Sequence, residues 1–226
     1  MLTKRLAACA DLVTGKGIAC DVGTDHAYLA AELLRTGRCQ SVIASDIGEG
    51  PLEAAERTLR QAGLLSRAQL ILSDGLMQIP AEGVTDVVIA GMGGETMIHI
   101  LKESPWVQQG VNLILQPMTK APLLREWLAE NGYAVRQEKI VQEGRFFYTV
   151  MQVQYDGEKR ILSPFIRELG DVDWREAAVR AYGRFRLKLY RGLGQQLMQA
   201  QPETAEMYRA LARELEEKCI EQEETV

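Results

Sequence analysis

The chain has 226 residues, of which 46% are hydrophobic and 25% are charged. This balance excludes a disordered chain, and the length accommodates one α/β domain of ordinary size with a smaller appendage. The formal net charge of −5 argues against a protein that binds polyanions indiscriminately. The sequence contains no C-x-x-C pair, no zinc-ligand spacing and no apolar stretch long enough for a signal peptide or a membrane span. We therefore expect a soluble cytoplasmic protein without a metal.

Along the first two thirds of the chain, helical patterns alternate with apolar runs. A short amphipathic helix is expected over residues 2–13, and five short apolar runs follow it, at 18–21, 42–46, 70–74, 87–90 and 113–116. Such runs are typical of parallel strands covered by helices on both faces. The pattern between the second and third runs is helical, with Pro51 in its first turn and Gly63 placed to end it. Two more helices are expected around residues 97–101 and 124–128.

The pattern changes after the fifth run. Residues 133–141 and 145–153 are two β-rich runs around Glu143-Gly144, which is a turn signal. Five parallel strands followed by a hairpin resemble the order of class I methyltransferases, whereas a dehydrogenase would more usually add a sixth β-α unit. The predicted fold class is α/β: a Rossmann-like domain over residues 1–156, whose mostly parallel sheet ends in an antiparallel hairpin.

The remaining residues, 157–226, have a helical pattern. Apolar residues recur at helical spacing in two stripes, and Pro202 lies in the break between them. The stripes consist of Tyr182, Phe185, Leu189 and Leu193, and of Met207, Leu211, Leu215 and Cys219. We expect an antiparallel helical hairpin, as in a coiled coil.

The helical part also carries a basic segment that the acidic total conceals. Residues 175–191 contain six basic residues and one acid. Basic residues recur there at spacings of four, four and three, which places them on one helix face; they are Arg180, Arg184, Lys188 and Arg191. One face can follow one RNA backbone, so these residues are candidates for RNA binding. The alternative is pairing with glutamates on the returning helix, such as Glu206, Glu214 and Glu217.

The segment Asp21-Val-Gly-Thr-Asp-His-Ala-Tyr-Leu29 places an acid and a glycine at the end of the first strand. Open α/β sheets bind ligands at that strand end, and Gly23 would let the backbone approach one closely. A dinucleotide site would have glycine where Asp25 stands, and this carboxylate would repel a pyrophosphate. S-adenosylmethionine has no phosphate and carries an ammonium and a sulfonium group. The acids therefore favour this cofactor over NAD.

Two more acids follow the second and third runs. Asp46 can accept hydrogen bonds from both ribose hydroxyls, and Asp74 from the adenine amino group. Asp is common in turns after strands, but three successive strands that end in Asp favour the cofactor interpretation. His26 is equally open to a capping or packing role. The expected cofactor-binding residues are Asp21, Gly23, Thr24, Asp25, His26, Tyr28, Asp46, Ile47, Asp74 and Gly75.

The acceptor of the methyl group is expected beside the segment Ala90-Gly-Met-Gly-Gly-Glu95, after the fourth run. Glycines at 91, 93 and 94 leave space for a flat base, although a tight strand-to-helix turn would itself require glycine. Gln116-Pro117, after the fifth run, would face the same pocket. The candidate catalytic residues are Gly91, Gly93, Gly94, Gln116 and Pro117.

Five motifs carry a resemblance to a known family. They are Asp21-Val-Gly-Thr-Asp-His-Ala-Tyr-Leu, Glu49-Gly-Pro-Leu-Glu-Ala-Ala, Asp74-Gly-Leu, Ala90-Gly-Met-Gly-Gly and Leu113-Ile-Leu-Gln-Pro. Taken in order, they resemble the bacterial tRNA adenine-22 N1-methyltransferases, known as TrmK. The resemblance spans residues 5–153, and the helical tail matches that family's coiled-coil hairpin in kind. One departure is Met118, which stands where Asn is expected after Gln-Pro.

The resemblance implies S-adenosylmethionine as cofactor, tRNA as partner and attack of the adenine N1 lone pair on the methyl carbon. Adenine N1 is unprotonated near neutral pH, so positioning, which can supply on the order of 7 kcal/mol or more, would replace a strong general base. The base must be turned out of the folded RNA, at a cost of roughly a few kcal/mol. Tyr28 would stack on it, or else lie in the core. The oligomeric state is open on the sequence alone.

Two other functions are open on the sequence alone. One is a small-molecule methyltransferase whose helical hairpin serves as a lid or dimer arm, for which the basic segment is a poor match. The other is a non-catalytic RNA-binding protein on the same fold. The intact set of Asp21, Gly23, Asp46 and Asp74 argues against that protein, because a lost cofactor site should decay.

Overall fold

The computed structural model describes residues 2–223, with side-chain surroundings as far as Lys218. The chain divides into two compact units, Met1–Ile161 and Leu162–Val226. Cys219, expected at the end of an apolar stripe, lies outside the described side chains.

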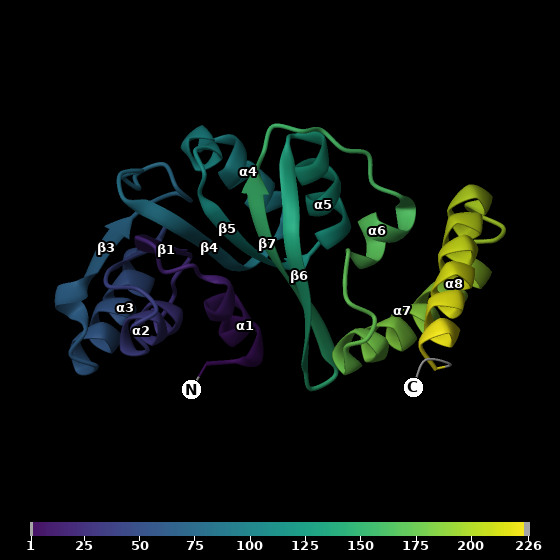
Figure 1. The fold of residues 1–226 in the computed structure, drawn as a ribbon, viewed down its shortest axis with the longest axis horizontal. Helices are drawn as coiled ribbons and strands as arrows, with labels where there is room; N and C mark the ends of the chain where they lie inside the picture. Colours follow the sequence, from purple (N-terminus) through teal and green to yellow (C-terminus); the bar gives the residue numbers. More distant parts are fainter. Residues whose placement is uncertain (1, 224–226) are drawn as a thin grey trace. The chain divides into compact units, whose positions relative to one another are not determined.

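The first unit is built on a seven-stranded sheet with the order β3-β2-β1-β4-β5-β7-β6 (Figure 1). The strands are β1 (Ile18–Val22), β2 (Val42–Asp46), β3 (Ala68–Leu72), β4 (Val84–Gly93), β5 (Asn112–Thr119), β6 (Tyr133–Glu143) and β7 (Phe146–Tyr155). The first five pair in parallel, and β7 is antiparallel to both β5 and β6. This is the predicted Rossmann-like methyltransferase fold with its terminal hairpin.

Helices cover both faces of the sheet, because successive residues of each central strand point to opposite sides. Val87 and Ile89 pack in one apolar cluster with α4 (Gly94–Lys102) and α5 (Ala121–Glu130). Val88 packs in the other with α1 (Lys4–Leu12), α2 (Tyr28–Arg35) and α3 (Glu49–Gln61). Two short 3-10 helices, Leu65–Arg67 and Pro105–Gln108, complete the unit. The helix predicted to end at Gly63 does so: this glycine follows the C-cap of α3 with φ of 70°.

The third strand is displaced from its predicted position at 70–74. It ends at Leu72: the Ser73 amide forms a last bond to β2, donating to the Asp46 carbonyl at 2.9 Å, and the chain then turns. The Ser73 hydroxyl donates to the Gly75 carbonyl at 2.9 Å and accepts from the Gln78 amide at 3.2 Å. Asp74 therefore belongs to a turn and not to the end of a strand.

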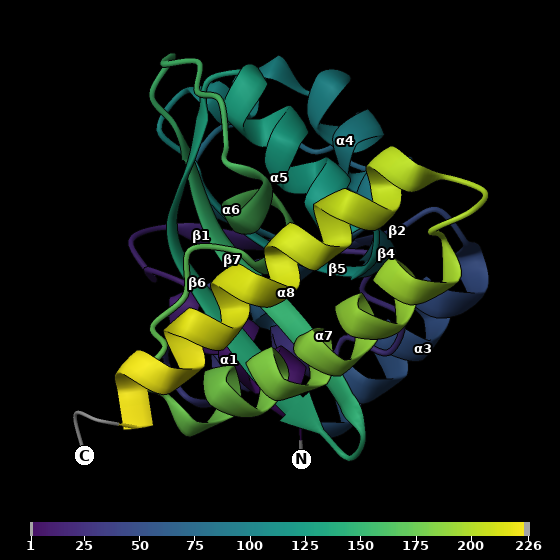
Figure 2. The ribbon, with the colours of Figure 1, turned by 90° about the vertical axis from the view of Figure 1, so that its right-hand side faces the viewer.

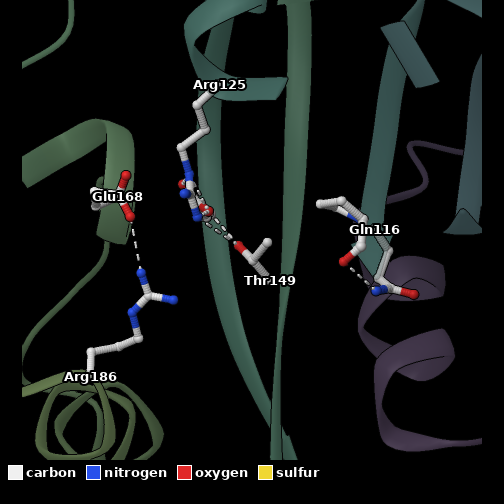
Figure 3. A network of polar contacts seen from close by, with 7 residues as sticks. Gln116, Arg125, Thr149, Glu168 and Arg186 are labelled. Atoms are coloured by element: carbon white, nitrogen blue, oxygen red, sulfur yellow. Dashed lines mark hydrogen bonds and ion pairs between the residues drawn. The ribbon is translucent and has the colours of Figure 1, made fainter. Parts of the chain in front are cut away.

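A buried ion pair joins the hairpin to α5 (Figure 3). Arg125 Nη2 lies 2.6 Å from Glu138 Oε1, with side chains 2% and 1% exposed. The Thr149 hydroxyl of β7 also donates to Glu138. Buried charges are tolerated only when their partners satisfy them, so this cluster fixes how α5, β6 and β7 pack.

The second unit contains α6 (Pro164–Leu169), α7 (Ala177–Gln196) and α8 (Pro202–Glu223). Helices α7 and α8 form the predicted hairpin, with Pro202 as the first residue of α8 (Figure 2). Sequence patterning did not predict α6, which begins where the Ser163 hydroxyl accepts from the Ile166 amide. Glu168 of α6 bonds to Arg186 of α7 at 3.1 Å (Figure 3).

The predicted apolar stripe of α7 is correct at Tyr182 and wrong at Phe185 and Leu189. Phe185 and Leu189 are 50% and 40% exposed, whereas Val179, Tyr182 and Tyr190 are buried. Glycine explains the rotation, because it lets neighbours approach closely. A Cβ at Gly183 would lie 2.7 Å from the Trp174 ring, and one at Gly194 would lie 3.0 Å from Arg209 of α8; these glycines belong to the buried face. A count of large apolar residues overlooks them.

Candidate methyl-transfer site

A cavity of about 230 Å³ opens at the edge of the sheet where β1 and β4 end. It is lined by Arg5, Leu6, Asp21, Gly23, Thr24, Asp25, His26, Tyr28, Leu29, Ala90 and Gly91. Six of the predicted cofactor-binding residues therefore come together with one predicted acceptor-side residue, Gly91. Asp46 lies next to these residues, with its carboxylate near the Asp25 amide. Five other predicted residues lie outside the lining: Ile47, Asp74, Gly75, Gly93 and Gly94.

The loop after β1 has an unusual backbone. Gly23, Asp25 and Ala27 have φ of 72°, 50° and 54°, in the left-handed region. The amides of Gly23 and Thr24 donate to the Ser45 carbonyl at 2.8 and 2.9 Å, which ties the loop to β2. Asp25 thus adopts a glycine-like backbone while supplying a carboxylate, a conformation that Asp tolerates better than most residues. At Gly23 the φ of 72° favours glycine, and a Cβ there would displace the flexible end of Met92, whose Cε would lie 2.3 Å away.

Asp21 is a buried carboxylate beside the cavity. Its Oδ2 accepts from the Thr24 hydroxyl at 2.7 Å. Burial raises the pKa of Asp21 to about 6, the hydrogen bonds from Thr24 and the Ala30 backbone oppose the rise, and the negative charge of Asp46 adds to it. Burial penalises an unneutralised carboxylate, and a cation in the cavity would relieve this penalty. A buried carboxylate fits the ammonium and sulfonium groups of S-adenosylmethionine.

Asp46 at the end of β2 faces the same loop. Its Oδ1 accepts from the Gly48 amide at 3.0 Å, and its Oδ2 lies 3.4 Å from the Asp25 amide. The adjacent Ile47 is 70% exposed, an apolar surface beside the carboxylate. These two residues fit a nucleoside, which needs acceptors for its hydroxyls and an apolar face for its base.

Asp74 and Gly75 lie in the turn after β3. The Asp74 side chain is exposed, and its amide donates to Gln78 Oε1 at 3.0 Å. Gly75 has φ of 56°, and a Cβ there would lie 2.8 Å from Ile100. The turn therefore requires glycine at 75 for packing against α4, which is the structural explanation for that residue.

His26 and Tyr28 stack on each other, with ring centroids 5.4 Å apart. Tyr28 is 57% exposed, so the alternative that it belongs to the core is wrong. The N-cap of α2 is Ala27 and has no side-chain capping bond, so His26 does not cap the helix. Both rings border the cavity.

The fourth strand extends past its predicted end at residue 90, so Gly91 and Gly93 belong to β4 and Gly94 begins α4; the three glycines play different parts. Gly91 has φ of 84°, lines the cavity and donates its amide to Gln116 Oε1 at 3.1 Å. Gly93 is the N-cap of α4, and a Cβ at Gly94 would lie 2.6 Å from the Lys120 carbonyl oxygen. The structural explanation therefore accounts for Gly94, whereas Gly91 lines the cavity.

Gln116 and Pro117 are buried at the end of β5. Gln116 Nε2 donates to the Pro117 carbonyl at 3.0 Å (Figure 3). It also lies 3.6 Å from the sulfur of Met118, whose side chain is 44% exposed. Met118 therefore offers a thioether, a weak acceptor, where the resemblance led us to expect an amide.

Arg5 is the site residue that sequence reasoning missed. Its guanidinium lines the cavity and donates through Nη1 to Gln116 Oε1 at 2.9 Å. It comes from α1, far along the chain from every glycine motif, and an arginine in an amphipathic helix gives no signal of its own. Only the fold brings it to the ends of β4 and β5.

The four predicted residues of the basic face of α7 differ in their partners. Arg191 bonds through Nε to Glu216 of α8 at 2.9 Å, and Arg180 donates to the Arg175 carbonyl. Arg184 and Lys188 are exposed and form no hydrogen bond or ion pair within the described part of the chain. The expected pairing partner Glu206 bonds instead to Arg209 and Arg213 of its own helix.

The described residues contain no group of three or more His, Cys, Asp or Glu side chains that could hold a metal ion. Within the same part of the chain, no helix is both long and apolar enough to cross a membrane.

Comparison with known proteins places these features in context. The model of a methyltransferase domain family matches residues 2–151. The tRNA (adenine(22)-N(1))-methyltransferase of Bacillus subtilis (strain 168) is 34% identical over 164 residues, which are 69% of this chain and 69% of that protein. The crystal structure of the B. subtilis m1A22 tRNA methyltransferase TrmK matches with a TM-score of 0.78 at 28% identity, over 99% of this chain and 98% of the other. Streptococcus pneumoniae Sp1610 in complex with S-adenosyl-L-methionine matches with a TM-score of 0.81 at 29% identity, over 94% and 100%.

Proposed function

The chain belongs to the family of tRNA (adenine(22)-N(1))-methyltransferases, and from this premise we propose that it transfers a methyl group from S-adenosylmethionine to N1 of adenine 22 in tRNA. The single observation that carries the proposal is the cavity in which the buried Asp21 carboxylate and the left-handed loop after β1 meet Gly91. A cationic cofactor and a flat acceptor would adjoin there.

The cofactor supplies an electrophilic methyl group on a sulfonium leaving group. The residues proposed to hold it are Asp21, Gly23, Thr24, Asp25, His26, Tyr28, Asp46, Ile47, Asp74 and Gly75. Asp21 and Asp25 offer negative charge to its cationic end, and Asp46 offers oxygens to its ribose hydroxyls. Asp74 is the weakest member of the set, since it stands in a turn outside the cavity lining.

The acceptor side needs little acid-base chemistry, because adenine N1 already has an available lone pair. Gly91 has no side chain and so would leave space for the acceptor base. Gln116 bonds to the Gly91 amide and to the Pro117 carbonyl, and these bonds fix the end of the strand. Positioning of the base for in-line attack can then supply on the order of 7 kcal/mol or more of the barrier reduction. Gly93 and Gly94, the other two proposed acceptor-side glycines, lie at the start of α4 and would act on the same geometry from there.

The exposed cations of α7 support a role in RNA binding. Arg184 and Lys188 have no internal partner among the described residues and are available to phosphates, whereas Arg191 is shared with Glu216. We assign cofactor binding and catalysis to residues 1–156 and tRNA binding to residues 157–226. Since the substrate is tRNA, the proposed location is the cytoplasm.

Methyl transfer from labelled S-adenosylmethionine to unmodified bulk tRNA, followed by nucleoside analysis, tests the proposal. Label should appear in 1-methyladenosine. A matched pair of transcripts, one with adenine at position 22 and one with guanine there, locates the modified base. Label in another nucleoside, or equal label in both transcripts, would refute the assignment.

A further inference from the structure

Three elements meet at the side-chain amide of Gln116. Its Oε1 accepts two hydrogen bonds, one from Arg5 Nη1 of α1 at 2.9 Å and one from the Gly91 amide of β4 at 3.1 Å. Gln116 itself belongs to β5. The carboxyl ends of β4 and β5 are thus joined to the N-terminal helix through one buried group.

Donor and acceptor chemistry fixes the orientation of this amide. A guanidinium and a backbone N–H can only donate, and the Pro117 carbonyl, which receives Nε2 at 3.0 Å, can only accept. Rotation of the amide by half a turn would break all three bonds. Without Arg5, Gln116 Oε1 would accept one hydrogen bond instead of two, and the orientation of the Gln116 amide would be less firmly fixed.

The same bonds leave Gln116 with few free donors or acceptors for hydrogen bonds to the substrate. Its oxygen already has two donors, and one of its two N–H groups is bound to Pro117. The other N–H points toward the sulfur of Met118 at 3.6 Å. Gln116 therefore serves the peptide of Gly91, which borders the cavity in a left-handed conformation, with φ of 84°.

Arg5 is itself held in place from the opposite side. Its main-chain N–H, one of those at a helix start that lack a partner within the helix, donates to Glu143 Oε1 at 2.7 Å. Its guanidinium lies beside Gly91, since a Cβ at Gly91 would be 3.7 Å from Nη1. The sequence of contacts runs from Glu143 through Arg5 and Gln116 to the Gly91 peptide.

We propose that Arg5 is a positioning residue for methyl transfer, which holds the Gly91 peptide at the acceptor side of the cavity by fixing the Gln116 amide. The proposal rests on the methyl-transfer function above. Arg5 acts through Gln116, so its removal lowers the rate of the bound complex and leaves the binding of cofactor and tRNA nearly unchanged.

Steady-state kinetics of Arg5→Ala test this role. The kcat for tRNA methylation should fall by about tenfold or more, while KM for tRNA and the Kd of S-adenosylmethionine stay within about threefold. Arg5→Lys retains a cationic donor and should recover most of the lost kcat, even if Arg5→Ala proves poorly folded. The matched control is Lys4→Ala, which removes the same charge from the neighbouring exposed position and should leave kcat unchanged.

A double-mutant cycle with Gln116→Met separates positioning from general damage. If Arg5 acts through Gln116, Arg5→Ala should lower kcat by less than about twofold in the Gln116→Met background. Equal effects in both backgrounds, or a change confined to KM, would overturn the proposal. An inactive wild-type protein would instead refute the proposed function, which keeps the two failures distinct.

Discussion

Asp21 combines burial with negative charge at the edge of the cavity. Burial raises its pKa to about 6, above the usual range of a carboxyl group, so at neutral pH the folded protein carries a charge that its surroundings penalise. A group whose pKa is raised in this way makes the folded state less stable above that pKa. The penalty is lost as the pH falls from about 6 toward the ordinary value. A bound cation would compensate for the same charge.

We therefore predict that cofactor affinity depends on pH through Asp21. The Kd of S-adenosylmethionine should be constant above pH 6 and should rise as the pH falls below about 6, because protonated Asp21 no longer attracts the cationic cofactor. Calorimetric titrations between pH 5 and pH 7.5, roughly one pKa unit or more on each side, would measure this.

Asp21→Asn is the control for that experiment. It should remove the pH dependence, weaken cofactor binding at neutral pH and raise the free energy of unfolding by up to about 3 kcal/mol in the absence of cofactor. A pH dependence that persists in Asp21→Asn would assign the titration to another group.

A second prediction concerns Asp46. Asp46→Ala should remove charge-assisted hydrogen bonds to the ribose and weaken S-adenosylmethionine binding by about 2 kcal/mol or more. Titration calorimetry measures this, and Asp46→Asn, which retains one acceptor oxygen for the Gly48 amide, should lose less. Unchanged affinity in a folded Asp46→Ala protein would mean that β2 does not border the cofactor.

At the scale of elements, periodicity predicts the sheet well and local packing poorly. Short apolar runs at the spacing of a β-α-β pattern indicate buried parallel strands, and the bounds of β2 are as predicted. The third strand is displaced by two residues because Ser73 satisfies its polar groups within a turn. Helix α6 is only six residues long, too short for a periodic signal.

Within the candidate site, too, local sequence patterns predict some residues and miss others. The acids and the glycine after β1 are contiguous in the sequence, so their spacing indicates their chemistry. Arg5 is 111 residues from the Gln116 oxygen that it binds, and no local pattern encodes that contact. The sequence also does not say why a glycine stands at a given position. Gly91 has a left-handed φ, whereas at Gly94 a Cβ would collide with the Lys120 carbonyl.

This distinction predicts different outcomes at two glycines near the end of β4. Gly91→Ala places a side chain at φ of 84°, at a cost of about 1–2 kcal/mol, and shifts the peptide held by Gln116. Methyl transfer should fall by about tenfold, with S-adenosylmethionine binding largely retained. Gly93→Ala has an ordinary φ, and its Cβ would lie 3.2 Å from the Thr119 hydroxyl and 3.9 Å from the Thr96 hydroxyl, so it should be nearer to wild type. Measurements of turnover and cofactor Kd would contradict this if Gly93→Ala were the more damaging.

For the whole molecule, the important electrostatic property is where the charges lie. A net charge of −5 would repel RNA if it were spread evenly, yet residues 175–191 are strongly basic. Within them, Arg191 is paired with Glu216, while Arg184 and Lys188 are exposed without a partner in the described chain. Exposed cations that release counterions from a polyanion make binding depend on salt, whereas paired ones do so less.

The final prediction is that the double variant Arg184→Ala/Lys188→Ala binds tRNA more weakly and with a flatter salt dependence. The slope of log K against log salt should fall by roughly one unit per lost phosphate contact, with cofactor affinity unchanged. The matched control is Arg57→Ala/Arg60→Ala on α3, whose arginines pair with Glu53 and Glu56 and whose removal changes the net charge equally. Equal slopes for the two variants would mean that only total charge matters. If the α7 variant lowered thermal stability and left the slope as it was, the basic face would contribute to folding and RNA would bind elsewhere.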